Sequence, residues 1–207
     1  MAEVIQLTQR RPDRAAPQGL GVSTATLYFD LASPYTYLVA ERVERRVGSA
    51  VWRPAMLPTP QARGEELVAE AQQRASALRM PLVWPERFPS RVPTAMRVAT
   101  YANEQGCVPA FAIAAGRLAF CGGFDLEDPE ILAEAAAAAG LDVDGALVAA
   151  RDPQRDHQIG MAGRSVGHAG GTVLPALEHE RRLYCGEPHI TAWLSQLGGA
   201  VARPSVS

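Results

Sequence analysis

Lysine is absent from this chain, and all 20 basic residues among its 207 are arginines. Without a lysine amine, the chain cannot form a Schiff base with a carbonyl substrate, and it cannot supply the lysine of a nucleotide-binding P-loop. An excess of charge is also missing, since the formal net charge is −2. This balance gives no sign of the basic surface that attracts nucleic acids or anionic membranes. We therefore expect neither as a partner.

Cysteine is scarce. Cys107, Cys121 and Cys185 are the only three, and no two of them form a Cys-x-x-Cys pair. An odd number without this spacing argues against the disulfide framework of a secreted protein, and it indicates a reducing, cytoplasmic compartment. The four histidines have no metal-ligand spacing. We therefore expect no metal site.

Long apolar runs are missing as well. No segment approaches the roughly 18 apolar residues that span a bilayer. Residues 1–23 are polar and lack the apolar core of a signal peptide, so we interpret them as a mobile N-terminal leader. The remaining length fits one domain with room for a sizeable insertion.

The chain does contain a clear transition from strand to helix at residues 26–48. Apolar residues alternate with other types from 27 to 31, which is the period of a strand with one apolar face. Ser33 then fits the N-cap of a helix, and Pro34 fits its first position. Apolar residues continue at spacings of three and four, and Gly48 offers a left-handed C-cap.

Ser33 has two interpretations. The unsatisfied N–H groups and the macrodipole make a helix N-terminus a place to hold an anion. Its hydroxyl can donate a hydrogen bond to a thiolate or carboxylate there, with Tyr35 or Tyr37 as a wall. Alternatively, the hydroxyl only accepts a bond from a helix N–H, and Tyr35 only packs. The local pattern does not separate the two.

The rest of the chain predicts a second strand at 50–57 and helices at 65–79, 94–104, 109–119, 128–140, 144–150 and 152–168. Asp-Pro pairs open two of these helices as N-cap and first residue. A hairpin of strands 172–178 and 181–185, with its turn at 178–180, precedes a last helix at 190–197. Pro175 inside the hairpin marks either an edge strand or a cis peptide bond.

This order of elements predicts an α/β fold of the thioredoxin-like type with an α-helical insertion domain. We divide the chain into the leader at 1–23, a discontinuous thioredoxin-like domain at 24–58 and 170–198, and a helical insertion at 59–169. In this arrangement the start of the first helix faces the proline turn. Ser33 and Leu174-Pro175 are therefore expected to lie across one cleft.

Several segments resemble the DsbA-like thioredoxin superfamily, and within it the 2-hydroxychromene-2-carboxylate isomerases and kappa-class glutathione transferases. Residues 29–37, FDLASPYTY, are similar to the family's Phe-Asp-x-x-Ser-Pro-Tyr-Ser-Tyr opening. Residues 81–85 with Phe88-Pro89 resemble its Pro-x-x-x-Pro stretch, and residues 95–97 and 125–129 match in order and spacing. The resemblance covers roughly residues 24–198.

The resemblance implies a glutathione cofactor, or a related small thiol, and a small-molecule electrophile as substrate. A serine at the position of Ser33 activates the cofactor by hydrogen-bonding its thiolate. The residue before the cis-proline, here Leu174, offers its backbone to the cysteinyl part beside Pro175. Pro34 and Tyr35 are expected to line the same site. Family members are commonly dimers, so we expect a homodimer.

Three departures from the family pattern affect the site. Residues 170–175, GGTVLP, lack an aromatic residue and a glycine of the family's Gly-x-Phe-Gly-Val-Pro. The family's Gly-x-Asp-Arg, whose aspartate helps to bind the γ-glutamyl group, reads Gly186-Glu187-Pro188-His189. Glu187 is the remaining candidate carboxylate, and His189 lies near the expected cleft. The loop at 58–63 is shortened and lacks the family's asparagine.

Three hypotheses remain open. The first is an isomerase or transferase that activates a small thiol at Ser33. The second is a dithiol oxidoreductase, which needs two cysteines where this chain has Ser33 and Thr36. The third is a non-catalytic thioredoxin-fold module that has lost the cofactor site and binds a peptide by strand addition beside Pro175.

Overall fold

The computed structural model describes residues 24–58 and 64–199. The expected leader and residues 59–63 of the shortened loop lie outside them. The elements in chain order are β1 (Thr26–Phe29), α1 (Pro34–Arg46), β2 (Val51–Pro54), α2 (Gly64–Ala77), α3 (Pro93–Glu104), α4 (Val108–Phe120), α5 (Pro129–Ala138), α6 (Val143–Ala150), α7 (Arg155–His168), β3 (Ala176–His179), β4 (Arg182–Cys185) and α8 (Glu187–Gly199).

The strands form one mixed sheet in the order β2-β1-β3-β4. β1 and β2 run parallel, joined by α1, with Thr26 beside Val51. β3 is antiparallel to β1, with Leu27 opposite Leu177, and β4 is antiparallel to β3. This is a thioredoxin-like sheet, and the predicted fold class is confirmed.

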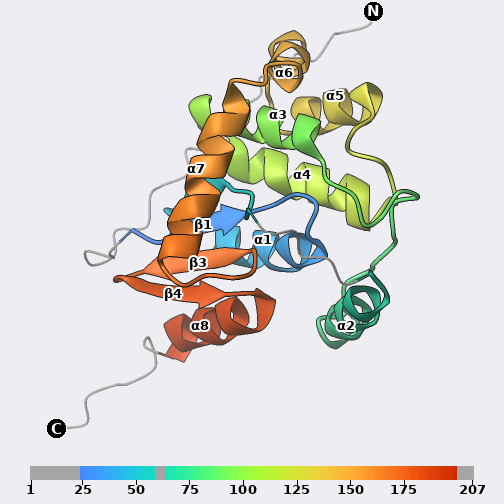
Figure 1. Ribbon diagram of the computed structural model, residues 1–207. Coiled ribbons are helices and arrows are strands. Elements are labelled where there is room, and N and C mark those ends of the chain that lie inside the picture. The colour runs from blue at the N-terminus through green and yellow to red at the C-terminus, as the bar shows by residue number, and fades with distance from the viewer. Residues whose placement is uncertain (1–23, 59–63, 200–207) are drawn as a thin grey trace, which may run out of the picture.

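Helices cover both faces of the sheet (Figure 1). Alternate strand residues, including Leu27, Phe29 and Leu177, enter the main core together with side chains of α1 and α8. Tyr28 and Ala176 point to the opposite face, where a smaller core forms with Val166 of α7 and its neighbours. In β1, side chains on both faces are therefore buried, so the prediction of a single apolar face does not hold for this strand, whereas β2 alternates between exposed and buried residues.

The helices α3, α4, α5 and α6 gather at one end of the molecule (Figure 1). α4 packs along α1, which joins this helical group to the sheet, while α7 returns from the group across β1 and β2. α2 lies apart from the group and contacts α1. The boundaries of an insertion domain at 59–169 stay a prediction.

Two helix ends differ from the prediction. α1 ends at Arg46 with Val47 as C-cap, and Gly48 does not take a left-handed conformation. α7 begins at Arg155 rather than 152, because the Asp152 carboxylate accepts the Gln154 N–H at 3.0 Å and forms a separate turn. An Asp-Pro pair can therefore close a turn without starting the helix.

The C-terminal hairpin also shifts. β3 starts only after Pro175, and Glu180 and Arg181 form the turn with φ of 49° and 63°. Two residues of positive φ suit a two-residue hairpin turn whose twist matches the strands. α8 begins at Glu187, three residues before the predicted start, with Pro188 in its first turn. This shift places Glu187 inside the helix, next to α1.

Gly163 is where α7 comes closest to the chain after β2. A Cβ on Gly163 would lie 1.9 Å from the carbonyl oxygen of Met56, whereas a Cβ on Gly167 would meet nothing within 4 Å. We expect Gly163→Ala to lower the free energy of unfolding by about 1–3 kcal/mol through overpacking. Gly167→Ala is the matched control, and we expect it to raise stability by about 0.5–1 kcal/mol. Urea unfolding of both variants measures this; equal stabilisation by both alanines would contradict the close approach.

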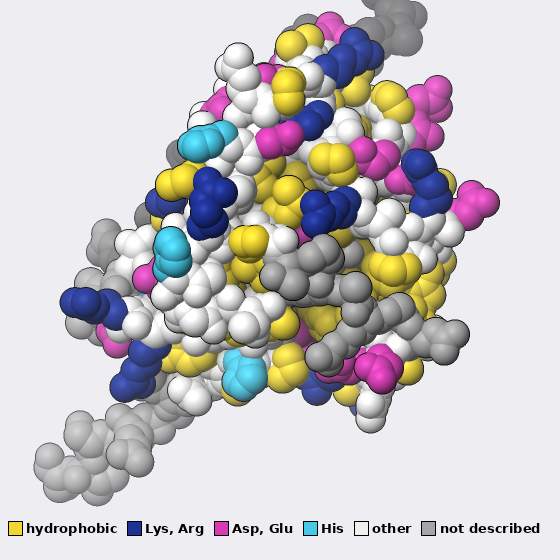
Figure 2. All heavy atoms as spheres, in the orientation of Figure 1, with side chains coloured by type: hydrophobic (Ala, Val, Ile, Leu, Met, Phe, Trp, Pro, Cys, Tyr) yellow, Lys and Arg dark blue, Asp and Glu magenta, His cyan; other side chains and the backbone are white. Residues whose placement is uncertain are grey.

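The surface carries both signs of charge. On the face shown in Figure 2, arginines and acidic side chains are intermixed rather than gathered by sign, as the small net charge suggests. Within the described ranges, no helix is both long and apolar enough to cross a membrane.

Candidate functional site at the start of α1

The loop between β1 and α1 is held by its own backbone and by α3. Asp30 accepts the Ala32 N–H on its carboxylate at 2.9 Å, and its carbonyl accepts the Ser33 N–H at 3.1 Å. The Leu31 N–H points at the sulfur of Met96, 3.4 Å away. These contacts fix the position of Ser33 relative to the sheet.

Ser33 occupies the N-cap position of α1, but its side chain does not cap the helix. Its backbone is extended, with φ −90° and ψ 120°, and no helix N–H bonds to its hydroxyl. The prediction of a side-chain cap is therefore wrong. Instead, the hydroxyl donates a hydrogen bond to the carbonyl oxygen of Leu174 at 3.2 Å. Ser33 is 8% exposed, so this contact is nearly buried.

The segment across from Ser33 contains a cis peptide bond. Leu174-Pro175 is cis, which decides between the two alternatives left by the sequence. The Pro175 carbonyl accepts the Gly186 N–H at 2.8 Å, which ties this turn to the start of α8. The predicted proximity of Ser33 to Leu174-Pro175 is confirmed by the hydrogen bond between them.

The electrostatics at Ser33 favour an anion. The N–H groups of Ser33 and Thr36 are bonded to the carbonyls of Asp30 and Ser33, so the positive potential at this end of α1 comes from the macrodipole, which adds about half a positive charge there. Pro34 supplies the first helical position without an N–H. A thiolate beside Ser33 would meet a hydroxyl donor and the positive end of a helix, which together lower a thiol pKa.

The two tyrosines of α1 have different surroundings. Tyr35 is half-buried toward α2, and burial, followed by the nearby carboxylate of Glu70, raises the pKa of its phenol. Tyr37 is buried between α1 and α4, donates to the Pro81 carbonyl at 2.9 Å and stacks on Phe120. Burial raises the pKa of Tyr37 to about 12. Both phenols thus stay protonated at neutral pH, and Tyr37 packs against α4.

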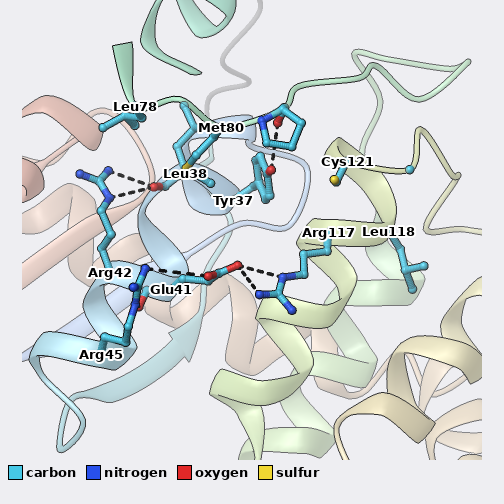
Figure 3. A pocket seen from close by; sticks show the side chains of 12 residues that line it. Tyr37, Leu38, Glu41, Arg42, Arg45, Leu78, Met80, Arg117, Leu118 and Cys121 are labelled. Carbon is cyan, nitrogen blue, oxygen red and sulfur yellow. Dashed lines mark hydrogen bonds and ion pairs between the residues drawn. The ribbon is translucent and has the colours of Figure 1, made fainter. Parts of the chain in front are cut away.

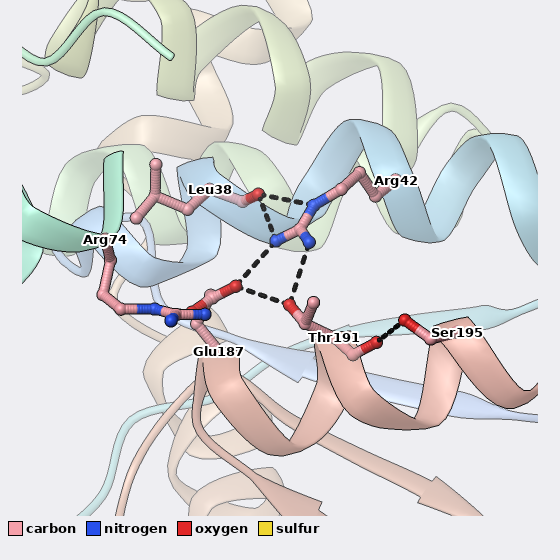
Figure 4. A network of polar contacts seen from close by, with 6 residues as sticks. All are labelled: Leu38, Arg42, Arg74, Glu187, Thr191 and Ser195. Carbon is pink, nitrogen blue, oxygen red and sulfur yellow. Dashed lines mark hydrogen bonds and ion pairs between the residues drawn. The ribbon is translucent and has the colours of Figure 1, made fainter. Parts of the chain in front are cut away.

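Glu187 forms a buried polar network at the start of α8 (Figure 4). One oxygen accepts from Arg42 at 2.9 Å and from Thr191 at 2.5 Å, and the other accepts from Arg74 at 2.7 Å. Burial alone would raise the pKa of Glu187, but the hydrogen bonds from Arg74, Thr191 and Arg42 outweigh it and hold the pKa below its usual value. This carboxylate therefore joins α1, α2 and α8.

Glu187 and His189 were predicted to hold the far end of a cofactor. Both carboxylate oxygens of Glu187 are already engaged, so a cofactor amine would have to compete with an arginine for them. His189 is exposed, and its Nδ1 lies 2.8 Å from the Cys185 carbonyl at the start of α8. Their roles in binding stay predictions.

Of the three cysteines, Cys185 lies nearest to this arrangement, since it packs against the small core that contains Leu174. Cys107, Cys121 and Cys185 are all free thiols, and burial raises the pKa of Cys107 and of Cys185. Thr36, one turn after Ser33, is buried, and its hydroxyl has no hydrogen-bond partner among the described residues. Within the same part of the chain, no cluster of side chains is suited to a metal ion.

The family of the chain follows from a sequence comparison. The model of the DSBA-like thioredoxin domain matches residues 24–161, which include the Ser33 loop and the helical group. The chain belongs to this family. No curated protein matches it at a significant level.

Solved structures share the fold at low sequence identity. A 2-hydroxychromene-2-carboxylate isomerase matches with a TM-score of 0.73 and 15% identity, covering 86% of this chain and 96% of that protein. A probable DsbA oxidoreductase from Streptomyces coelicolor matches with a TM-score of 0.66 and 20% identity, covering 89% of this chain and 93% of that protein. The cytosolic disulfide reductase DsbM from Pseudomonas aeruginosa matches with a TM-score of 0.64 and 16% identity, covering 86% of this chain and 98% of that protein. These likenesses establish the fold.

Sequence reasoning missed the residues that contact the site but lie far from it in the sequence. Arg42 and Arg74 bind Glu187 from 145 and 113 residues away, and Met96 meets Leu31 from 65 away. No local pattern marks such partners. The signal that was available is Pro188, because a proline in the first turn marks a helix start at Glu187 rather than at residue 190.

Asp30 offers a test of the loop. Burial is the main cause that raises its pKa to about 6, while the Ala32 N–H and Arg91 act against it. A carboxyl whose folded pKa is raised costs stability above that pKa, and costs none below its unfolded pKa. We expect Asp30→Asn, which keeps the acceptor for Ala32, to raise the free energy of unfolding by about 1–3 kcal/mol above pH 6.

The gain from Asp30→Asn should shrink between pH 6 and 4 and vanish below pH 4, as measured by urea unfolding across this range. Asp128→Asn is the matched control, because Asp128 makes the same kind of carboxylate bond, to the Glu130 N–H at 2.8 Å, but is exposed. A gain from Asp30→Asn that does not change with pH would show that the charge on Asp30 is not its source.

Proposed function

We propose that this chain is an enzyme that binds glutathione, or a related small thiol, with its sulfur at Ser33 and uses the thiolate on an electrophilic substrate as an isomerase or transferase. One observation carries the proposal: the Ser33 hydroxyl lies at the N-terminus of α1, against the carbonyl that precedes cis-Pro175. A donor and a helix dipole meet there, and the chain places no thiol of its own at that point. The reactive sulfur must therefore come from a bound molecule.

The chemistry that this site supports is thiolate addition. The Ser33 O–H, which donates to the Leu174 carbonyl in the free protein, turns to the cofactor sulfur and stabilises its negative charge. The thiolate adds to an electron-poor C=C bond of the substrate: a C–S bond forms, the π bond breaks, and its electron pair moves onto the conjugated carbonyl. In a transferase the C–S bond remains and the substrate takes up a proton from solvent. In an isomerase the electron pair returns after the substrate has changed its geometry, which breaks the C–S bond and releases the thiolate.

The similar structures support this proposal without deciding it. One is described as 2-hydroxychromene-2-carboxylate isomerase, and DsbM has also been described with GSH. DsbM itself, however, is described as a disulfide reductase, and the Streptomyces coelicolor protein as a probable DsbA oxidoreductase. Dithiol exchange of that kind needs cysteines where this chain has Ser33 and Thr36.

A non-catalytic binding module is the second candidate, and the Glu187 network favours it. Both oxygens of the one carboxylate at the expected γ-glutamyl end are held by arginines and Thr191. If this network never opens, the chain cannot use Glu187 to bind the amine of glutathione. A peptide bound along the backbone beside Pro175 would then be the ligand.

Calorimetric titration distinguishes the two candidates. Wild type, Ser33→Ala and Thr36→Val are titrated with glutathione, N-acetylcysteine and S-methylglutathione, which has no thiol. We expect a free thiol to bind with release of a proton near neutral pH, and Ser33→Ala to weaken binding by about tenfold or more. Thr36→Val removes a hydroxyl that bonds to no described residue, so it should bind like wild type. If no thiol binds, the enzyme proposal is wrong.

A further inference from the structure

A groove lies between α1, α4 and the segment that follows α2 (Figure 3). Its volume of about 510 Å³ falls in the range of small-molecule sites. Ser33 and Pro175 are not among the residues that line it, so it is distinct from the site at the start of α1.

The floor of the groove is apolar and flexible. Leu38, Leu78, Met80 and Leu118 line it, and methionine and leucine side chains adapt easily to an alkyl chain. The hydroxyl of Tyr37 is already bonded to a backbone carbonyl, so it presents no unmet polar group. The α1 residues of the lining extend from 37 to 45, which corresponds to about 12 Å of helix. This length suits a medium-length alkyl chain.

The rim of the groove carries an excess of positive charge. Arg117 binds Glu41 at 2.7 Å, and Arg45 reaches the same carboxylate at 4.0 Å. Arg42, the third arginine of the lining, is paired with Glu187 at 2.9 Å. Two guanidinium groups thus share one carboxylate at the rim, which leaves about one positive charge beside the apolar floor. Glu41 takes two of the five N–H donors of Arg117.

We propose that this groove binds a free medium-chain carboxylate, with its alkyl chain on the apolar floor and its carboxylate between Arg45 and Arg117. The apolar floor and the positive rim complement the two ends of such a molecule. Planar guanidinium groups bind carboxylates well, because they donate paired hydrogen bonds. The site needs no residue of the proposed thiol chemistry, so either proposal can fail while the other stands.

The probe is decanoate below its micelle concentration, titrated calorimetrically into the full chain. Decyltrimethylammonium, which has the same chain and the opposite charge, is the matched ligand. We expect decanoate to bind and the cation not to bind. Arg117→Gln should weaken decanoate binding by about tenfold, the effect of one charge-assisted hydrogen bond. Arg164→Gln removes an exposed arginine of α7 and should leave it unchanged.

Cys121 reports where the ligand sits, because it lines the groove and is exposed. Decanoate should slow the alkylation of Cys121 but not that of Cys107, as followed by mass spectrometry. Equal binding of the cation, an unchanged affinity of Arg117→Gln, or alkylation of Cys121 at its free rate would each overturn the proposal. Binding only to micelles or lipid vesicles would overturn it as well, since it would assign the apolar face to a membrane surface.

Discussion

Replacing Ser33 with cysteine is expected to produce a thiol with a pKa at least about one unit below the usual 8.5. The new sulfur would take the place of the hydroxyl at the N-terminus of α1, where the helix dipole favours the thiolate. At neutral pH much of this cysteine would be ionised, against a few per cent of an ordinary thiol. This result requires no cofactor, so it tests the electrostatics of the site alone.

The thiol pKa of the Ser33→Cys variant is measured from the pH dependence of alkylation, with each cysteine followed separately by mass spectrometry. Ser165→Cys is the matched control, because it makes the same substitution in the last turn of α7, where the helix dipole disfavours a thiolate. Its pKa should be ordinary or raised. If the cysteine at 33 ionises no more readily than the one at 165, the start of α1 does not stabilise a thiolate.

Glu187→Gln is expected to cost about 3 kcal/mol of stability, the lower end of what breaking a buried ion pair costs. The carboxylate is fully buried, and its loss would leave Arg42 and Arg74 facing a neutral amide. The arginine side chains are 23% and 32% exposed, so water partly compensates them and the cost stays at that lower end. Because the network joins three helices, we also expect α2 to lose protection from hydrogen exchange.

The control for Glu187→Gln is Glu41→Gln, which removes a partly exposed carboxylate shared by Arg45 and Arg117. It should cost less than about 1 kcal/mol. The pH dependence is a second check. The folded pKa of Glu187 is lowered, so its contribution is present above the unfolded pKa and is lost as pH falls through the folded pKa. An equal loss of unfolding free energy in Glu187→Gln and Glu41→Gln would contradict the buried network. So would a difference between the two variants that remains below the folded pKa of Glu187.

The fold could be predicted from the sequence because local patterns and topology agree. Alternating and helical periodicities located every helix and strand to within a few residues. The order of these elements then placed Ser33 opposite Leu174-Pro175, although 141 residues separate the bonded pair. In a thioredoxin-like sheet, connectivity alone brings the start of the first helix to the hairpin.

The details that failed depend on which of two local solutions the tertiary structure selects. The Ser33 hydroxyl can accept from the helix or donate to a neighbour, and the buried Leu174 carbonyl needs the donor. Asp152 caps a separate turn rather than α7. From the sequence, Glu187 was interpreted as an unpaired carboxylate, because its arginine partners come from helices that are distant in the sequence. Such partners become visible only when the helices are packed together.

The central claim is that Ser33 stabilises the thiolate of a bound small thiol. The most direct measurement is the ultraviolet absorbance of that thiolate across a pH titration, with glutathione bound to wild type, to Thr36→Val and to Ser33→Ala. We predict that the pKa of the bound thiol falls by about one unit or more in wild type and Thr36→Val, and falls clearly less in Ser33→Ala. The account would be contradicted if the bound thiol had the same pKa in all three proteins. It would also be contradicted if the pKa of glutathione bound to wild type equalled that of free glutathione.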